Sequence, residues 1–163
     1  MTQRNFDIAI KKGNIGEAIV KAHLERSGWC VFQPTTEGSH SFDMLCIKDK
    51  KKAIALDVKA KARMTHIYGT GIDQRYFDEY MAFSKKHCMP FYLAFVDEST
   101  GEIYGNSLHK LEEGYTEGRN HYPRMIGKQR IWNLHQMNFI AKIPKEKIHD
   151  LKKFSQRNYE YAA

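Results

Sequence analysis

Two aspartates and a lysine are spaced so that a short hairpin would bring them together. Asp43 lies in one strand-like run of residues, and Asp57 and Lys59 lie in the next. If the polar residues 49–51 form the turn, strand pairing places Asp43 opposite Asp57 on the same face of the hairpin. Because directly opposed carboxylates repel each other, this arrangement predicts a compensating cation between them.

The chemistry that such a group could perform is phosphodiester hydrolysis. That reaction needs a hard cation with oxygen ligands, and a positive side chain that steadies the nucleophile or the developing charge. Strand alternation puts Lys59 on the same face as Asp57, so Asp43 and Asp57 would bind Mg²⁺ (or Mn²⁺) beside the lysine. A half-exposed strand whose aspartates and lysine simply face solvent is the alternative.

The elements that must position these residues follow from the apolar spacing. We predict a helix, three strands, a second helix and a further strand, at 14–27, 29–33, 42–48, 53–61, 73–86 and 91–96. Residues 62–72 and 107–129 are predicted to form loops, 131–143 one or two strands, and the segment after Pro144 a final helix. This order predicts one layered α/β domain over residues 1–163, with a mixed sheet.

Glu17 has two possible roles. The segment from Asn14 to Glu17 has the spacing of a helix capping box, with Asn14 as the N-cap. A helical wheel also places Glu17 away from the apolar stripe of Ile15 and Ile19, where it could point toward a sheet edge. The sequence leaves both roles open.

These motifs, taken in order, resemble the PD-(D/E)XK nuclease superfamily. The matching motifs are a helix with Gly13 to Glu17, Ser41-Phe-Asp43, Asp57-Val-Lys59, and a later helix that carries Gln74. The resemblance covers residues 13–97 and is greatest to phage and archaeal Holliday-junction resolvases and related small endonucleases. It implies a restriction-endonuclease-like α/β fold, with a central mixed sheet flanked by helices.

The same resemblance implies a role for each matching residue. Asp43 and Asp57 would be metal ligands, Glu17 an accessory ligand, Lys59 the catalytic lysine and Gln74 a further active-site residue. The sequence departs from the family pattern in that Phe42 replaces proline and Asp57 replaces the commoner glutamate. The shorter side chain of Asp57 bears on which metal is preferred.

The balance of charge favours a polyanionic partner, for which DNA is the natural candidate. The chain has 26 Lys and Arg against 19 Asp and Glu, a formal charge of +7. Positive residues follow the catalytic strand and recur in a second stretch rich in aromatic residues; the candidate DNA contacts are Lys61, Arg63, Arg119, Arg124, Lys128 and Arg130. Solvated basic loops are the alternative for both stretches.

Other classes of protein receive less support. The three cysteines lack CxxC spacing, and no apolar run is long enough for a secretory signal or a membrane span, so we expect a cytoplasmic protein without a membrane partner. Two-fold symmetric DNA substrates would favour a homodimer. The competing hypotheses are a catalytically inactive nucleic-acid-binding module of the same fold, and a structural protein with solvated ion pairs.

Overall fold

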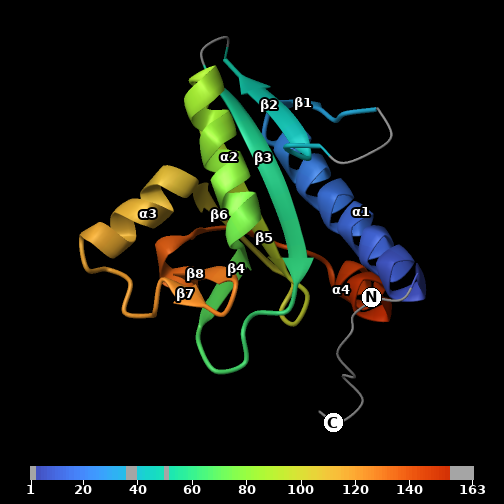
Figure 1. Ribbon diagram of the computed structural model, residues 1–163. Helices are drawn as coiled ribbons and strands as arrows, with labels where there is room; N and C mark the ends of the chain where they lie inside the picture. The colour runs from blue at the N-terminus through green and yellow to red at the C-terminus, as the bar shows by residue number, and fades with distance from the viewer. Residues whose placement is uncertain (1–2, 36–39, 50–51, 155–163) are drawn as a thin grey trace.

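A six-stranded mixed sheet forms the centre of the molecule (Figure 1). The computed structural model describes residues 3–35, 40–49 and 52–154. Strands β3 and β5 are parallel, and the other neighbouring strands of this sheet are antiparallel. The mixed sheet predicted from the sequence is therefore confirmed. Its strands, in spatial order, are β1 (Cys30–Phe32), β2 (Met44–Lys48), β3 (Lys52–Lys61), β5 (Phe91–Asp97), β6 (Glu102–Ser107) and β9 (Asn138–Lys142).

The β2–β3 hairpin has the register that the sequence predicted. Lys48 pairs with Lys52 and Met44 with Leu56, which is the register of a turn centred on residue 50. Residues 50 and 51 of that turn lie outside the described residues. Because β2 begins at Met44 whereas β3 continues to Lys61, the last part of β3 extends beyond β2 and pairs with β5 on its other side.

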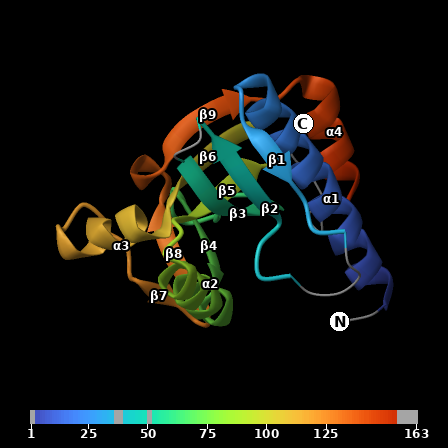
Figure 2. The same ribbon diagram turned by 90° about the horizontal axis from the view of Figure 1, so that it is seen from above.

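Helices cover both faces of the sheet (Figure 2). One face is covered by α1 (Gln3–Arg26) and α4 (Lys145–Lys153). The other is covered by α2 (Gln74–His87), α3 (Leu108–Thr116) and a second, three-stranded sheet. The strands of that sheet, in spatial order, are β4 (Gly69–Asp73), β8 (Gln129–Asn133) and β7 (Met125–Ile126), and a short 3-10 helix, η1 (Leu134–Gln136), follows β8.

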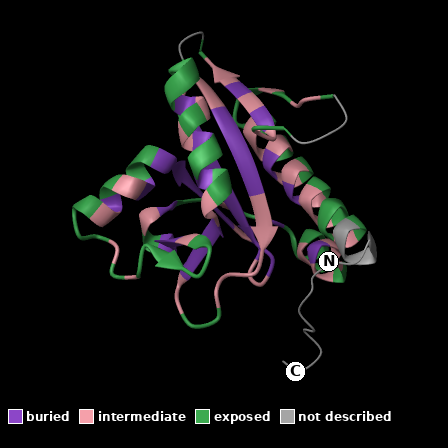
Figure 3. Ribbon diagram, viewed as in Figure 1, coloured by how far each residue is buried: buried purple, intermediate pink, exposed green. Residues whose placement is uncertain are grey.

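Strand β3 is covered on both sides, so its middle is buried (Figure 3). Leu56 and Val58 pack with Val20 of α1, whereas Ala55 packs on the opposite face with Phe77 and Tyr80 of α2. Burial of each large apolar side chain stabilises the fold by about 1.5–3 kcal/mol. A carboxylate in the middle of this strand must therefore be buried as well.

The first helix is longer than the sequence predicted. α1 begins at Gln3, so Asn14 lies in mid-helix, and of the two roles left open for Glu17 the capping box is excluded. In mid-helix the backbone N–H groups already donate to carbonyls one turn earlier and need no cap. Gly16 has a different reason to be glycine, because a Cβ there would lie 2.6 Å from the Cβ of Ala60. The glycine lets α1 approach β3 closely.

Two segments predicted to be loops contain regular structure. In the first, predicted over 62–72, β4 begins at Gly69 and ends at Asp73. A Cβ at residue 69 would lie 2.8 Å from the carbonyl oxygen of Trp132, so glycine permits the close approach of the two strands. Within 107–129, Ser107 caps α3 by accepting a hydrogen bond from the Lys110 N–H (3.3 Å). Both predictions missed elements whose partners are distant in the chain, β8 for β4 and the core around Trp132 for α3.

The other predicted elements are present, and β6, β7 and η1 are further elements that the sequence did not predict. Asp73 caps α2 through a hydrogen bond from the Arg75 N–H (3.0 Å), residues 131–143 contribute to two strands, and α4 follows Pro144. Within the described part of the chain, no helix combines the length and apolar character needed to cross a membrane.

Candidate active site

One pocket of about 360 Å³ is lined by four of the residues singled out in the sequence: Glu17, Asp43, Asp57 and Lys59. It lies where β3 extends beyond the first residue of β2. The side chains come from α1, from the residue before β2, and from β3, so a helix and a hairpin build the site together. The other lining residues are Asn14, Gln33, Pro34, His40, Tyr76 and Tyr80.

Asp43 is held by the backbone of the neighbouring strand. Its Oδ2 accepts a hydrogen bond from the Val58 N–H (2.7 Å), and its own N–H donates to the carbonyl of Leu56 (3.0 Å). Burial and the nearby charge of Asp57 raise the pKa of Asp43 to about 7. At neutral pH this carboxyl group is therefore poised between its charged and neutral forms.

Asp57 is buried, with 3% of its surface exposed. Its Oδ1 accepts hydrogen bonds from the Tyr80 hydroxyl (2.7 Å) and the Lys59 ammonium (2.9 Å). Its Oδ2 lies 2.8 Å from the same Lys59 nitrogen as an ion pair, yet no described residue gives Oδ2 a hydrogen bond of acceptable geometry. A buried carboxylate oxygen with capacity to spare is available to a further electrophilic partner.

Lys59 lies between the carboxylates and two aromatic rings. Its ammonium nitrogen is 5.4 Å from the centroid of Tyr76 and 6.0 Å from that of Tyr80, within the range of cation–π attraction. Burial lowers the pKa of Lys59, but the ion pair with Asp57 and the charge of Asp43 outweigh it, and the pKa is raised. The lysine is therefore a fixed positive charge at neutral pH.

Glu17 lies at the rim of the pocket and is half-buried. Its Oε2 accepts a hydrogen bond from the Gln33 amide (3.3 Å), and Lys21 in turn donates to Gln33 (3.0 Å). Burial and the charge of Asp57 raise the pKa of Glu17. The close approach of α1 to β3 at Gly16 brings this carboxylate to the same pocket as Asp57.

The donor set suits a hard divalent cation in chemistry but is small. Carboxylate oxygens are the ligands that Mg²⁺ and Mn²⁺ prefer, and a cation between Asp43 and Asp57 would relieve their repulsion and engage Asp57 Oδ2. Among the described residues, however, no three His, Cys, Asp or Glu side chains converge closely enough to hold a metal ion. A cation bound by the two aspartates would retain several waters, as Mg²⁺ usually does.

Gln74 lies outside this pocket. Its amide nitrogen donates to Asp78 (2.7 Å), and its amide oxygen accepts from Arg130 (3.4 Å). α2 instead directs Tyr76 and Tyr80 toward the carboxylates. Tyr80 lies in the core, and the hydrogen bond from its hydroxyl to Asp57 had no signal in the sequence.

The candidate DNA contacts fall into three groups. Two of the arginines are engaged internally: Arg63 binds Asp97 (2.5 Å), and Arg130 forms a hydrogen-bonded ion pair with Glu112. Arg119, Arg124 and Lys128 are exposed, although Glu117 lies 2.6 Å from Arg119 and Glu112 lies 4.0 Å from Arg124. Lys61 is partly buried and donates to the carbonyl of Gly71.

Comparison with known proteins finds similar folds among solved structures. No family model and no curated protein matches the sequence. The structure is similar to Hjc, a Holliday junction resolvase from the archaeon Archaeoglobus fulgidus, with 12% identity, a TM-score of 0.55, and coverage of 76% of this chain and 90% of that one. It is also similar to a nuclease from a fusellovirus, with 8% identity, a TM-score of 0.55, and coverage of 90% and 93%. The resolvase-like fold expected from the motifs is thus confirmed.

Proposed function

We propose that the chain is a divalent-metal-dependent DNA endonuclease that hydrolyses phosphodiester bonds at the Asp43–Asp57 pocket. The observation that carries this proposal is the burial of two mutually repelling carboxylates beside a fixed ammonium group. Such an arrangement destabilises the fold unless a bound ligand neutralises the repulsion between the carboxylates. The nuclease folds of the structural neighbours add support from a second direction.

Each residue of the pocket has a part in the proposed reaction. A bound Mg²⁺ or Mn²⁺ would activate water and polarise the phosphate. Asp43 and Asp57 would hold that cation, with Glu17 as an accessory ligand, and Tyr80 fixes the orientation of Asp57 through its hydroxyl. Lys59 presents its ammonium group to the nucleophile or to the charge that develops on the phosphate oxygens.

The proposed substrate is branched DNA, bound by a homodimer. Hjc is named a Holliday junction resolvase, and a four-way junction has the two-fold symmetry that a dimer could match. The exposed cations Arg119, Arg124 and Lys128 are candidates for backbone contacts outside the pocket. Light scattering of the protein with and without a junction would test the dimer.

A cleavage panel tests the proposal directly. Four-way, linear and single-stranded DNA and RNA of matched sequence would be incubated with Mg²⁺, Mn²⁺, Ca²⁺ or EDTA. We expect cutting of DNA with Mg²⁺ or Mn²⁺, strongest on the junction, and its loss in Lys59→Ala with junction affinity retained. The matched control Lys86→Ala, an exposed lysine of α2, should cut normally. Full activity of Lys59→Ala, or activity in EDTA, would remove the catalytic assignment.

The alternative is a nucleic-acid-binding module that lacks catalysis. The small number of converging ligands in the described residues favours it. It predicts junction binding that is unaffected by Mg²⁺, by Asp57→Asn or by Lys59→Ala, and no cutting with any metal. The cleavage panel and a calorimetric titration of Mn²⁺ into wild type and Asp57→Asn therefore separate the two functions.

A further inference from the structure

A second, larger pocket is lined by a residue of β3, the strand that carries Asp57 and Lys59. It has a volume of about 450 Å³, which is within the range of small-molecule sites, roughly 300–1,000 Å³. Lys61 lines it, two residues after Lys59, so the two side chains point to the same face and are spaced about 7 Å apart along the strand. One extended ligand could therefore contact Lys59 and also enter this pocket at Lys61.

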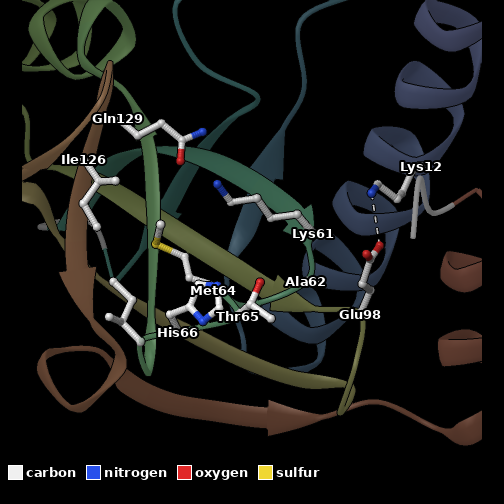
Figure 4. Close-up of a pocket in the computed structure, with 10 residues that line it drawn as sticks. Lys12, Lys61, Ala62, Met64, Thr65, His66, Glu98, Ile126 and Gln129 are labelled. Carbon is white, nitrogen blue, oxygen red and sulfur yellow. Dashed lines mark hydrogen bonds and ion pairs between the residues drawn. The ribbon is translucent and has the colours of Figure 1, made fainter. Parts of the chain in front are cut away.

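The walls of this pocket combine apolar and hydrogen-bonding groups. Met64 and Ile67 from the segment after β3, and Ile126 from β7, supply apolar surface. Gln129 of β8 supplies an amide that can both donate and accept. Figure 4 shows the Lys61 amine and the Gln129 amide pointing toward each other across the pocket. Apolar walls with one such amide suit a flat heterocycle that carries polar edges.

The two lysines of the pocket are held differently. Lys12 of α1 is paired with the buried carboxylate of Glu98 (3.0 Å), as the dashed line in Figure 4 marks. Lys61 has no carboxylate partner among the described residues, and there its hydrogen-bond acceptor is the carbonyl of Gly71. An ammonium group has three donors, so Lys61 can still bind an anion. Burial and the charges of Lys59 and Lys12 lower its pKa to about 8, which an anion would reverse.

We propose that this pocket binds an unpaired nucleotide of the DNA strand that is cut, with its base between the apolar walls and Gln129 and its phosphate at Lys61. The inference rests on the proposed function, because it takes the scissile phosphate to lie at Lys59. A paired base remains stacked in the duplex and cannot enter, whereas an unpaired or mismatched base is the least costly to extrude. The preferred substrate would thus carry an unpaired nucleotide next to the cut, as flaps, bulges and open branch points do.

Equilibrium binding in EDTA tests the pocket without relying on cleavage. The probe is a duplex with a single bulged 2-aminopurine, compared with the same duplex in which 2-aminopurine is paired with thymine. We expect the bulged probe to bind at least about tenfold more tightly, and its fluorescence to change on binding because the base leaves the stack. Lys61→Met and Gln129→Leu, which keep side-chain length and volume, should lose most of this preference.

Controls separate the pocket from general affinity and from folding. Lys86→Met removes an exposed lysine of α2 and should keep the preference, and thermal melts show whether each variant is folded. Equal affinity for both duplexes, or a preference that survives in folded Lys61→Met and Gln129→Leu, would overturn the inference. Cleavage of both duplexes at equal rates with equal affinity would overturn the pocket and leave the nuclease standing. Preferential binding of the bulged duplex without any cleavage would support the pocket and overturn the nuclease proposal.

Discussion

Two buried carboxylate sites in this molecule differ in how fully they are satisfied. At the far end of β5, Asp97 is completely buried and accepts bonds from Arg63 (2.5 Å), Thr100 (3.1 Å) and the Ser99 N–H (2.9 Å). At the β2–β3 hairpin, Asp57 is nearly as buried and is paired with Lys59, but it also faces a second carboxylate, and its Oδ2 accepts no hydrogen bond from the described residues. The first arrangement is typical of a structural ion pair, and the second of a site that is completed by a ligand.

The largest expected effect separates the two aspartates. Asp57→Asn should lower the cleavage rate by more than about 100-fold, since even groups that only orient a metal ligand are worth 10–100-fold. Its melting temperature should change less than that of Asp97→Asn, because the lost ion pair with Lys59 is offset by relief of the repulsion from Asp43. Asp97→Asn should instead destabilise the fold by about 2 kcal/mol or more, because it breaks a buried charge pair. Nuclease assays and urea unfolding of both variants check this. If the two variants lose activity and stability to the same extent, the distinction between a functional Asp57 and a structural Asp97 is wrong.

A pair of glycines tests how far the hairpin site depends on its helix. Gly16→Ala places a Cβ 2.6 Å from Ala60, so we expect a loss of about 1–3 kcal/mol and weaker Mn²⁺ binding, since Glu17 moves with α1. Gly13→Ala on the same helix meets nothing within 4 Å and should stabilise the protein by up to about 1 kcal/mol. Chemical denaturation and metal titration measure both. A neutral Gly16→Ala would show that the close approach is not required.

Removing one hydroxyl from each region sharpens the comparison further. Tyr80→Phe deletes the hydrogen bond to Asp57, and we expect about a tenfold loss of activity with about 1 kcal/mol of stability. Tyr68→Phe deletes a bond to Tyr104 near Arg63 and should cost similar stability with normal activity per folded molecule. Kinetics at saturating metal, alongside thermal melts, distinguish them. If Tyr80→Phe keeps full activity, the Tyr80 hydroxyl has no role in the proposed reaction and the ring serves only in packing.

The smallest effect is a difference in the sign of the pH dependence. The pKa of Asp43 is raised from 3.8 to about 7, so its contribution to stability is full below pH 4 and is lost as the pH rises through 7. Glu102, hydrogen-bonded by Tyr104, has a lowered pKa, so its contribution is present above pH 4.5 and is lost on acidification.

We therefore expect the metal-free protein to lose a few degrees of melting temperature between pH 5 and pH 8, on the order of 1 kcal/mol. Asp43→Asn should reduce that loss, and Glu102→Gln should leave it intact. Melts across this range, in EDTA and then with Mn²⁺, give the measurement. If Asp43→Asn loses as much melting temperature as the wild type over this range, ionisation of Asp43 beside Asp57 is not the cause.

The features predicted from the sequence are those that depend on near neighbours. The hairpin register, and with it the meeting of Asp43 and Asp57, follows from a polar turn and strict alternation over a few residues. The start of α2, predicted at residue 73 and found at Gln74, is equally local, because Asp73 accepts a hydrogen bond from the Arg75 N–H. These signals need no knowledge of how the helices pack.

The features that were missed depend on distant partners. β4 is glycine-rich and becomes a strand because β8, some sixty residues later, pairs with it. Arg63 reads as a DNA contact until β5 and β6 bring Asp97 and Glu102 beside it. The Tyr80 bond to Asp57 depends on how α2 lies across the sheet, which residue spacing does not specify.

Because Asp43, Asp57 and Lys59 come from one hairpin, the central residues of the proposed site are encoded in a short stretch of the gene, and Glu17 and Tyr80 are added from the two helices. The outer segment 117–124, between α3 and β7, contributes nothing to the lining of that pocket. If 117–124 contacts DNA as proposed, selection can lengthen or replace it and so change the substrate, while the spacing of the carboxylates is inherited intact. We expect relatives to diverge fastest in that segment and slowest between Asp43 and Lys59.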